Sequence, residues 1–515
     1  MSIQKISTYA WMWLQAYQIT IEVDANKALP TIEIIGLADT AIKEAKERIR
    51  ATFRNIWFKL PPQKIVVNLS PSDIKKIWTR FDVPIALGIL LYFLGDQLDE
   101  TKQDLVKKSI FFGELGLDGT IKPISGLLPT VLVAMEHGYK HFFVPEENYP
   151  ELLCLPDISI YPLTHFWQLV DFFQNQGDIA PVQWSLEAFW SINSTEQLQF
   201  KDIKWHVFVK RALMIAAAGM HNILMVWPPG SGKTMLAKTI PSLLPPMTFE
   251  EQLEVSKIYS VVGQLTKEQP MITQRPFRPV HHTASKISIV GGWSQMTPGE
   301  ISLAHRGVLF FDELPEFPRE VLEVLRQPIE DKQVTISRAQ WSVQYPADFM
   351  FVAAMNPCKC GYYQDKEKAC TCSYLDIQKY QSKISGPMLD RIDMIIEVPR
   401  ERIEKILDKE PELDATNFRE QVIHAQEMQK KRFTGYTYTV NAQIQAKDIQ
   451  KLIPLSDETT KFFTHAVHSL NISPRLLHRI QKIARTIADL GWSEEVTTQH
   501  LAEALQYRAK AYFVN

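Results

Sequence analysis

The stretch Ile223–Lys238, "ILMVWPPGSGKTMLAK", limits the fold of this 515-residue chain more than any other. An apolar run leads into a short loop of proline, glycine and serine, and a helical pattern follows. The loop matches the second half of the phosphate-binding pattern G-x-x-x-x-G-K-[ST] with Gly232, Lys233 and Thr234. The position of the first glycine holds Trp227. A strand, a glycine loop and a helix in this order predict a parallel α/β sheet that binds a nucleotide phosphate.

We call residues 227–234 the phosphate loop. Backbone N–H groups in such a loop point at phosphate oxygens, and the helix N-terminus adds its positive end. Lys233 would neutralise the β- and γ-phosphates, and Thr234 would be a ligand of Mg²⁺. We therefore expect ATP and Mg²⁺ as cofactors. The predicted nucleotide-binding residues are Trp227, Pro228, Pro229, Gly230, Ser231, Gly232, Lys233, Thr234 and, from a later strand, Asp312.

Composition is that of a globular protein, with 45% apolar and 22% charged residues and a net charge of −2. Nucleic-acid binding would therefore depend on local patches or on an assembled ring. The N-terminus lacks the pattern of a signal peptide, and the longest apolar run, Val83–Leu94, is too short to span a bilayer. We expect a cytoplasmic protein without a membrane partner, whose five cysteines are reduced.

Secondary-structure patterns divide the chain into four parts. Residues 1–175 alternate strands and helices and predict an α+β domain, and the weakly patterned residues 176–199 predict a linker. Residues 200–400 alternate strands and helices as a parallel sheet does, whereas residues 401–515 look helical and predict a lid. The expected fold class is multidomain α/β.

Polar residues end two apolar strands that follow the phosphate loop. "RGVLFFDELPE" ends its strand in Asp312 and Glu313, and "FMFVAAMNP" ends in Asn356. Asp312 would hold the Mg²⁺ shell together with Thr234, and Glu313 would polarise the attacking water, which the amide of Asn356 would position. Glu313 and Asn356 are therefore candidate catalytic residues.

Two arginines are the other catalytic candidates. Arg391 lies in "SGPMLDRID", and Arg475 lies in "SPRLLHRI" at the start of a C-terminal helix. An arginine can reach the γ-phosphate held by a neighbouring subunit and stabilise the charge of the transition state. A surface salt bridge is the alternative for either residue.

Together these motifs resemble an AAA+ ATPase. "GLADTAIKEAKERIRA", "FDVPIALGIL", "GEISLAHRGVLFFDELPEF", "VAAMNPCKCGYY" and "SGPMLDRIDMIIEVP" resemble more closely the bacterial magnesium-chelatase-like ComM/YifB family, over nearly the whole chain. The resemblance implies that Asp312 and Glu313 are Walker B, Asn356 sensor 1, Arg391 the arginine finger and Arg475 sensor 2. It also implies a homo-hexameric ring that moves on single-stranded or branched DNA and drives branch migration in recombination of incoming DNA. A motor on a protein partner and a non-hydrolysing scaffold are the alternatives.

The segment "GELGLDGTIKPISGLLPTVLVAMEHGYKHFFVP" resembles the peptidase domain of Lon proteases, which implies an S5 domain 2-like fold for residues 1–175. It also raises a rival class, a Ser/Lys protease. Leu128 stands where the catalytic lysine would be, and the register puts Arg80 at the serine position. Without nucleophile and base there is no covalent catalysis, so we expect a scaffold or a DNA-interacting domain.

Four cysteines form the pattern C-x-C-x9-C-x-C. Four thiolates in two close pairs suit tetrahedral Zn²⁺, although C-x2-C is the usual spacing, and four free thiols are the alternative. The candidate zinc ligands, in an insertion over residues 358–372, are Cys358, Cys360, Cys370 and Cys372; Cys154 fits a core position.

Two segments, "RPFRPVHHTASK" and "VTISRAQWSVQYPA", lie where this branch of AAA+ proteins has pore-facing insertions. Arg275, Arg278, Lys286 and Arg338 are candidates there for DNA phosphate contacts, with a solvated basic face as the alternative. We interpret His281 and His282 as ordinary loop histidines.

Glycine is scarce, at 21 of 515 residues or roughly 4% against about 7% usually, while tryptophan reaches 12. Eight tryptophans stand where the family pattern has glycine: Trp13, Trp57, Trp78, Trp205, Trp227, Trp293, Trp341 and Trp492. Glycine positions often need a positive φ or a close backbone approach, which a bulky side chain resists. Our hypothesis is that these positions are glycine in the native protein, encoded by UGA codons that some bacterial lineages read as glycine. The alternative is a genuine variant with a damaged phosphate loop.

Overall fold

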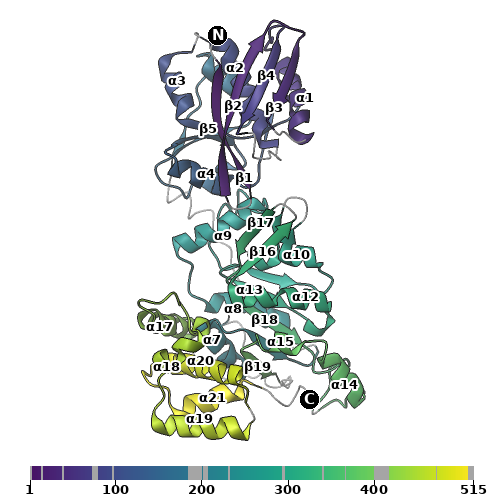
Figure 1. The fold of residues 1–515 in the computed structure, drawn as a ribbon, viewed down its shortest axis with the longest axis vertical. Coiled ribbons are helices and arrows are strands. Elements are labelled where there is room, and N and C mark those ends of the chain that lie inside the picture. The colour runs from purple at the N-terminus through teal and green to yellow at the C-terminus, as the bar shows by residue number, and fades with distance from the viewer. Residues whose placement is uncertain are drawn as a thin grey trace, which may run out of the picture. The chain divides into compact units, whose positions relative to one another are not determined.

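The computed structural model describes residues 3–12, 15–36, 40–71, 79–95, 98–183, 200, 207–229, 232–292, 296–338, 341–365, 367–398, 417–470 and 472–508. The chain folds as two compact units: a first unit of residues 1–195 and 252–273, and a second unit of residues 196–251 and 274–515 (Figure 1). The segment 252–273, which the sequence placed in the 200–400 domain, thus packs with the first unit. Among the described residues, no helix is both long and apolar enough to cross a bilayer.

The first unit holds two four-stranded sheets. One has the order β1-β2-β4-β3, and only its β3–β4 pair is parallel. Its strands are β1 (Gln4–Met12), β2 (Gln15–Asn26), β3 (Thr31–Ile35) and β4 (Lys64–Ser70). The other has the order β10-β9-β8-β5, with strands β5 (Ser109–Phe111), β8 (His141–Pro145), β9 (Ser159–Leu163) and β10 (Val182–Gln183). A short antiparallel pair, β6 (Glu114–Leu115) and β7 (Ile121–Lys122), completes the strands described in this unit.

Helix α2 (Asp82–Leu94) is the most buried helix of the first unit, because nearly all of its residues are apolar and packed. This confirms the prediction that the apolar run 83–94 is a core helix. Its side chains form one core with the inward faces of β1, β2 and β4. The other helices are α1 (Thr40–Asn55), α3 (Glu100–Lys107), α4 (Leu127–Glu136) and α5 (Trp167–Phe173), and α9 (Phe249–Val261) enters this unit at residue 252.

The second unit is built on a five-stranded, fully parallel sheet, as the alternating pattern predicted. Its order is β12-β15-β18-β11-β19, with strands β11 (Ile223–Val226), β12 (Phe277–Val280), β15 (Val308–Phe311), β18 (Met350–Met355) and β19 (Met394–Glu397). The three central strands are buried along their whole length, as expected of a parallel sheet that is covered on both faces. Two antiparallel hairpins lie outside it: β13 (Gly291–Gly292) with β14 (Thr297–Pro298), and β16 (Gln333–Arg338) with β17 (Trp341–Pro346).

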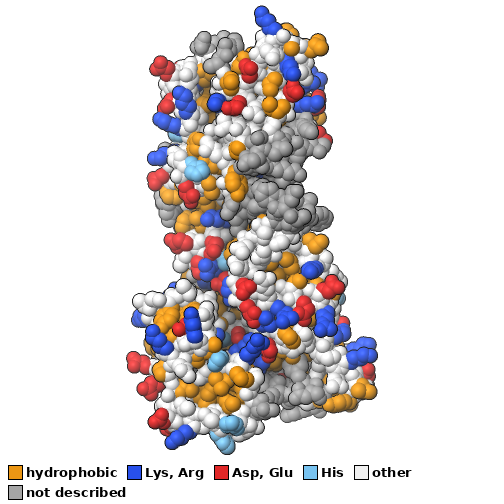
Figure 2. Space-filling view, in the orientation of Figure 1, with side chains coloured by type: hydrophobic (Ala, Val, Ile, Leu, Met, Phe, Trp, Pro, Cys, Tyr) orange, Lys and Arg blue, Asp and Glu red, His pale blue; other side chains and the backbone are white. Residues whose placement is uncertain are grey.

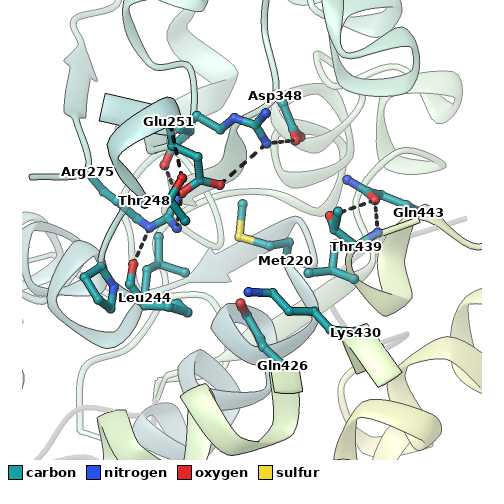
Figure 3. Close-up of a pocket in the computed structure, with 14 residues that line it drawn as sticks. Met220, Leu244, Thr248, Glu251, Arg275, Asp348, Gln426, Lys430, Thr439 and Gln443 are labelled. Carbon is teal, nitrogen blue, oxygen red and sulfur yellow. Dashed lines mark hydrogen bonds and ion pairs between the residues drawn. The ribbon is translucent and has the colours of Figure 1, made fainter. Parts of the chain in front are cut away.

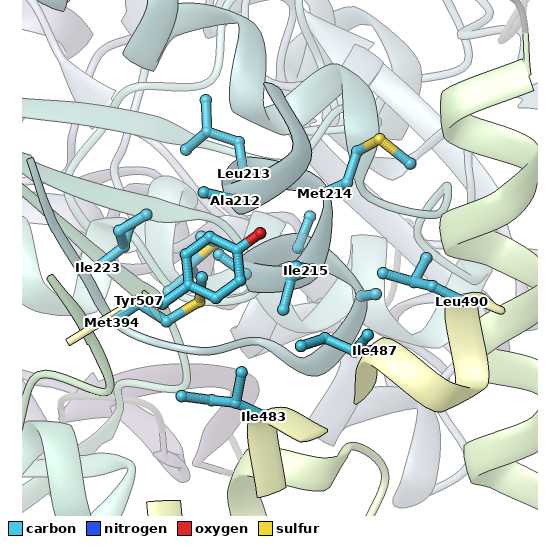
Figure 4. Close-up of a cluster of buried hydrophobic side chains, with 14 of the residues drawn as sticks. Ala212, Leu213, Met214, Ile215, Ile223, Met394, Ile483, Ile487, Leu490 and Tyr507 are labelled. Atoms are coloured by element: carbon cyan, nitrogen blue, oxygen red, sulfur yellow. The ribbon is translucent and has the colours of Figure 1, made fainter. Parts of the chain in front are cut away.

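Helices of the second unit pack on this sheet and on one another. Figure 4 shows side chains of α7 and α20 meeting those of β11 and β19 in the main core. The helices around the sheet are α7 (Val207–Gly219), α8 (Lys233–Leu243), α10 (Lys286–Val290), α11 (Glu300–Leu303), α12 (Arg319–Val324), α13 (Arg326–Asp331), α14 (Tyr374–Gln381) and α15 (Gly386–Leu389). The C-terminal helices are α17 (Asn417–Arg432), α18 (Ile449–Leu452), α19 (Asp457–Ser469), α20 (Pro474–Leu490) and α21 (Thr498–Gln506).

Candidate nucleotide site

The carboxyl ends of three neighbouring strands bring the predicted site residues together. Strand β11 leads into the phosphate loop, β15 ends before Asp312, and β18 ends before Asn356. Because β18 pairs in parallel with both β11 and β15, all three ends lie at one edge of the sheet. This edge is where open α/β sheets bind their ligands.

Two hydrogen bonds join the phosphate loop to the other strand ends. The Thr234 hydroxyl donates to Asp312 Oδ2 over 3.0 Å, and Lys233 Nζ donates to the amide oxygen of Asn356. Burial lowers the pKa of Lys233, and the carboxylates of Asp312 and Glu313 oppose this shift. A hydroxyl and a carboxylate oxygen are ligands that Mg²⁺ prefers, so Thr234 and Asp312 fit the predicted Mg²⁺ site, and Lys233 fits a phosphate ligand.

The described ends of the phosphate loop have different surroundings. Gly232 has φ +80° and caps the N-terminus of α8, a left-handed conformation that favours glycine. Trp227 is fully buried in the main core, and its backbone N–H donates to Met355 O over 2.9 Å. The Trp227 indole is therefore part of the core. Gly230 and Ser231 lie outside the described residues.

Glu313 has an unusual backbone and a partner that the sequence did not indicate. Its φ of 53° is left-handed, which is costly for a residue with a side chain. Its carboxylate lies 3.2 Å from Nδ1 of His282, which follows β12 as Glu313 follows β15. Since β12 and β15 are parallel neighbours, their ends meet at the same edge. His282, interpreted from sequence as an ordinary loop histidine, thus contacts the candidate catalytic carboxylate; the shared strand-end position was the available signal.

The two candidate arginines lie near each other and are held by their own chain. Arg391 donates to Pro387 O over 2.7 Å and pairs with Glu330 over 2.8 Å. Arg475 pairs with Asp390 over 3.6 Å, and 75% of its side chain is exposed. The salt bridges that the sequence left as alternatives are present, and of the two side chains Arg475 is the more accessible.

Two candidate DNA-contacting arginines are engaged inside the second unit. Arg275 donates to Pro245 O over 2.6 Å and Arg306 O over 2.7 Å, and Arg278 binds Glu300 in a two-point ion pair. Lys286 is exposed at the start of α10, and the side chain of Arg338 lies outside the described ones.

Arg275 also lines a cavity of about 120 Å³ (Figure 3). Lys430 and Gln426 from α17 border it from the side of the C-terminal helices, opposite Glu251. Arg275 lies 3.3 Å from Glu251. The Arg275–Glu251 ion pair therefore lies at the edge of the cavity. The described lining of the cavity comes from segments other than the phosphate loop.

The four candidate zinc ligands converge. Their sulfur atoms all lie within 4.8 Å of one another, and each cysteine is a free thiol. Cys154 is buried in the first unit, as predicted for a core residue.

The positions where a Lon-type peptidase would carry its catalytic pair also come together. Arg80 is buried, donates to the carbonyl of Ser125 and to the hydroxyl of Thr130, and so lies beside the turn that leads to Leu128. Burial lowers the pKa of Arg80 to about 9, and the nearby Glu151 opposes this shift. An arginine and a leucine supply neither nucleophile nor base, and the expectation that this domain is no peptidase stays a prediction.

Among the unusual tryptophans that the structure describes, Trp57 and Trp492 have a backbone that favours glycine. Trp57, after α1, and Trp492, after α20, have φ of 58° and 60° at helix C-termini. Helices commonly end with a left-handed glycine at this position. Trp13, Trp78, Trp205 and Trp293 lie outside the described residues, and so does the side chain of Trp341. The described backbone therefore supports the glycine hypothesis at Trp57 and Trp492.

Comparison with known proteins agrees with the motifs. Residues 199–406 match the profile of "Magnesium chelatase, subunit ChlI", residues 21–148 that of "Subunit ChlI of Mg-chelatase", and residues 412–508 that of the ChlI C-terminal region. Competence protein ComM of Haemophilus influenzae is 39% identical over 514 residues, 99% of this chain and 98% of the relative. YifB of Escherichia coli is 37% identical over 511 residues, 99% of this chain and 97% of the relative. The chain therefore belongs to the ComM/YifB family of magnesium-chelatase-like AAA+ ATPases.

Proposed function

We propose that this protein is an ATP-driven ring motor that remodels branched DNA, as a branch-migration helicase in recombination of incoming DNA during natural transformation. The observation that carries the ATPase part is the meeting of Lys233, Thr234, Asp312 and Asn356 at one sheet edge. The DNA part is supported by the full-length similarity to a relative named as a competence protein.

Each residue at the edge has a defined task in hydrolysis. Lys233 binds the β- and γ-phosphates. Its hydrogen bond to the amide of Asn356 is then replaced by contacts with phosphate oxygens. Thr234 and Asp312 would hold Mg²⁺, which would supply positive charge to the phosphates. Asn356 is then free to orient a water molecule, and Glu313 polarises that water when its carboxylate leaves His282. The contacts among these residues are thus ones that a bound nucleotide replaces.

Assembly into a homo-hexamer would complete the site. Arg391 and Arg475 are held by carboxylates of their own chain, so a neighbouring subunit's nucleotide must compete for them. The exposed Arg475–Asp390 pair contributes about 0–1 kcal/mol, so a γ-phosphate can displace it. Arg391 is 13% exposed and would also have to leave the carbonyl of Pro387. We propose Arg391 as the arginine that acts across the interface and Arg475 as the one that senses nucleotide.

DNA would contact residues that several subunits contribute to the ring, more than a single basic surface on one subunit. On the face drawn in Figure 2, basic and acidic side chains of the described residues are interspersed. Lys286, on α10 close to the β13–β14 hairpin, remains a candidate contact within the ring.

The test is ATP hydrolysis by the purified full-length chain with and without a four-way DNA junction. We expect the junction to stimulate hydrolysis and its strands to be released in an ATP-dependent way, with Glu313→Gln abolishing both. No stimulation by single-stranded or branched DNA would overturn the DNA proposal and leave the ATPase proposal standing.

A second candidate function follows from the ChlI profiles, which cover most of the chain. A ring of this type could act on a protein partner instead of DNA. A protein that co-purifies and stimulates hydrolysis, in a preparation that DNA leaves unaffected, would favour this function.

A further inference from the structure

The cysteine cluster has the dimensions of a metal site. Sulfur–sulfur distances are 3.3 Å for Cys358–Cys360, 3.5 Å for Cys360–Cys370 and 3.7 Å for Cys358–Cys370. Four thiolates about 2.3 Å from a tetrahedral Zn²⁺ lie about 3.8 Å apart. A disulfide would need about 2.05 Å. The four sulfur atoms therefore surround a point that suits one tetrahedral ion.

The loop that carries these cysteines is held by local hydrogen bonds around Asp365 and has several exposed side chains. It runs from the end of β18 to Ser373, which caps α14, and between them Lys359, Glu367 and Lys368 are exposed. Of the four cysteines only Cys358 is buried. A cross-link that closes a long loop reduces the conformational freedom of its unfolded state and so stabilises the loop.

This loop touches the nucleotide site at two points. Gly361, with φ +85°, lies against Pro229 of the phosphate loop so closely that an added Cβ would be 2.6 Å from Pro229 Cδ. Asn356, the amide bound to Lys233, is two residues before Cys358. A buried hydrogen bond of 3.0 Å from Gln381 Nε2 to Pro357 O fixes the chain between them. The cysteine loop thus reaches the phosphate loop and the water-positioning amide directly.

We propose that Cys358, Cys360, Cys370 and Cys372 bind one Zn²⁺, and that this site clamps Asn356 and Pro229 in the geometry that ATP hydrolysis needs. Soft thiolates select zinc over the hard ions of the nucleotide site. Binding releases the thiol protons and changes no oxidation state. Loss of the ion makes the turn at Gly361 more mobile, so Pro229 of the phosphate loop loses a residue that packs against it. The proposed effect of zinc on ATP hydrolysis rests on the proposed ATP site, whereas zinc binding by the four cysteines does not.

The first experiment measures zinc per full-length chain, purified under reducing conditions without added metal, by mass spectrometry of the element. We expect about one zinc per chain, and a tetrahedral thiolate spectrum when cobalt replaces it. Cys360→Ser and Cys372→Ser should lose the ion, whereas the control Cys154→Ala, in the first unit, should keep it. Absence of bound zinc with four titratable thiols, or disulfides among the four cysteines in the native protein, would overturn the zinc site.

A second experiment tests the clamp with zinc retained. Gly361→Ala places a Cβ against Pro229 and imposes a strained φ, so ATP binding and turnover should each fall about 10-fold while zinc stays at one per chain. Gly435→Ala is the matched control, because Gly435 also has a positive φ but has open space around it. Lys233→Ala should lose ATP binding and keep zinc. Wild-type affinity and turnover in both Gly361→Ala and zinc-free Cys360→Ser would overturn the clamp.

Discussion

Two polar clusters, one in each unit, differ in what their groups contact. At the sheet edge of the second unit, Lys233 and Asp312 are half-buried and bond to residues that a ligand can displace. In the first unit, Arg80 and Glu151 are buried, and Glu151 accepts a 2.7 Å hydrogen bond from Ser260. Both clusters contain shifted pKa values, so a shifted pKa alone does not mark a catalytic site. Accessibility to a ligand separates them.

The largest expected effect is on turnover, from substitutions at the sheet edge. Lys233→Ala removes the phosphate charge, and Glu313→Gln removes the group that polarises water, so each should lower kcat at least about 100-fold. The matched controls are Lys238→Ala, exposed on the same helix, and Glu316→Gln, exposed three residues further on. Steady-state ATP hydrolysis measures the effect. Wild-type turnover in Glu313→Gln would place the catalytic role elsewhere.

The next effect is on stability, from the buried cluster of the first unit. Arg80→Met removes the hydrogen bonds to the Ser125 carbonyl and the Thr130 hydroxyl and leaves these groups unpaired, which should cost about 1–3 kcal/mol of unfolding free energy. Exposed Arg54 gives the control Arg54→Met. Denaturant unfolding reports the loss, and ATP turnover per folded chain should not change. If Arg80→Met reduced turnover and left stability intact, the cluster would be functional and the contrast between the units would fail.

The sheet edge could be predicted well because it depends on local rules. Each of three apolar strands ends one residue before Trp227, Asp312 or Asn356. Parallel pairing aligns the ends of neighbouring strands, independently of the loops that connect them. The assignment of Arg80 and Leu128 to the catalytic positions of a Lon-type peptidase stays a prediction from their surrounding sequence. Cys spacing indicated the convergence of four sulfur atoms.

What the sequence could not predict depends on side chains brought together from distant loops. The His282–Glu313 contact requires knowing that β12 and β15 are neighbours, which no local pattern states. The partners of Arg275 are mostly backbone carbonyls. Every residue has a carbonyl, so residue types cannot predict these contacts. The packing of residues 252–273 with the first unit is likewise decided by long-range contacts, because α9 reads as one uninterrupted helix.

Opposite pH responses of the two units would sharpen the comparison. Burial raises the pKa of the Glu151 carboxyl to about 7, so between pH 4.5 and 7 the unfolded first unit holds fewer protons and stability falls as pH rises. Burial lowers the pKa of His221 to about 4, so between pH 6.5 and 4 the unfolded second unit holds more protons and stability falls as pH drops. Unfolding of each unit, followed from pH 4.5 to 6.5, should give slopes of opposite sign. Glu151→Gln should reduce the first slope to the part that Asp82 contributes, because burial also raises the pKa of Asp82 to about 6. Parallel slopes of the two units would contradict these assignments.

Smaller effects of about 1 kcal/mol are expected at two tryptophans with left-handed backbones, one in each unit. Trp57→Gly should stabilise the first unit because the strain of a positive φ disappears. Trp492→Gly should stabilise the second unit less, because the indole stacks on His424 with ring centres 3.4 Å apart. Trp167→Gly, exposed at the start of α5, is the control and should destabilise.

The same two positions test the glycine hypothesis directly. Peptide mass spectrometry of the protein from its native source should show glycine at 57, 227 and 492. Tryptophan at these positions would refute the hypothesis, and the stability gains above would then measure strain that the native protein carries.

The smallest expected effect concerns the pairing of His282 with Glu313. We expect this pair to lower the basal rate of ATP hydrolysis at the sheet edge. This pair holds the Glu313 carboxylate against His282, which follows β12, and both side chains are partly exposed. Such a pair contributes up to about 1 kcal/mol, so His282→Ala should raise DNA-independent hydrolysis about 2- to 5-fold. His281→Ala is the matched control, since His281 bonds Thr283 over 2.8 Å instead of Glu313. A lower basal rate in His282→Ala would mean that the histidine positions Glu313 for attack. In that case the strained φ of Glu313 would belong to the active geometry, and the second unit would be pre-organised for hydrolysis before DNA or a neighbouring subunit arrives.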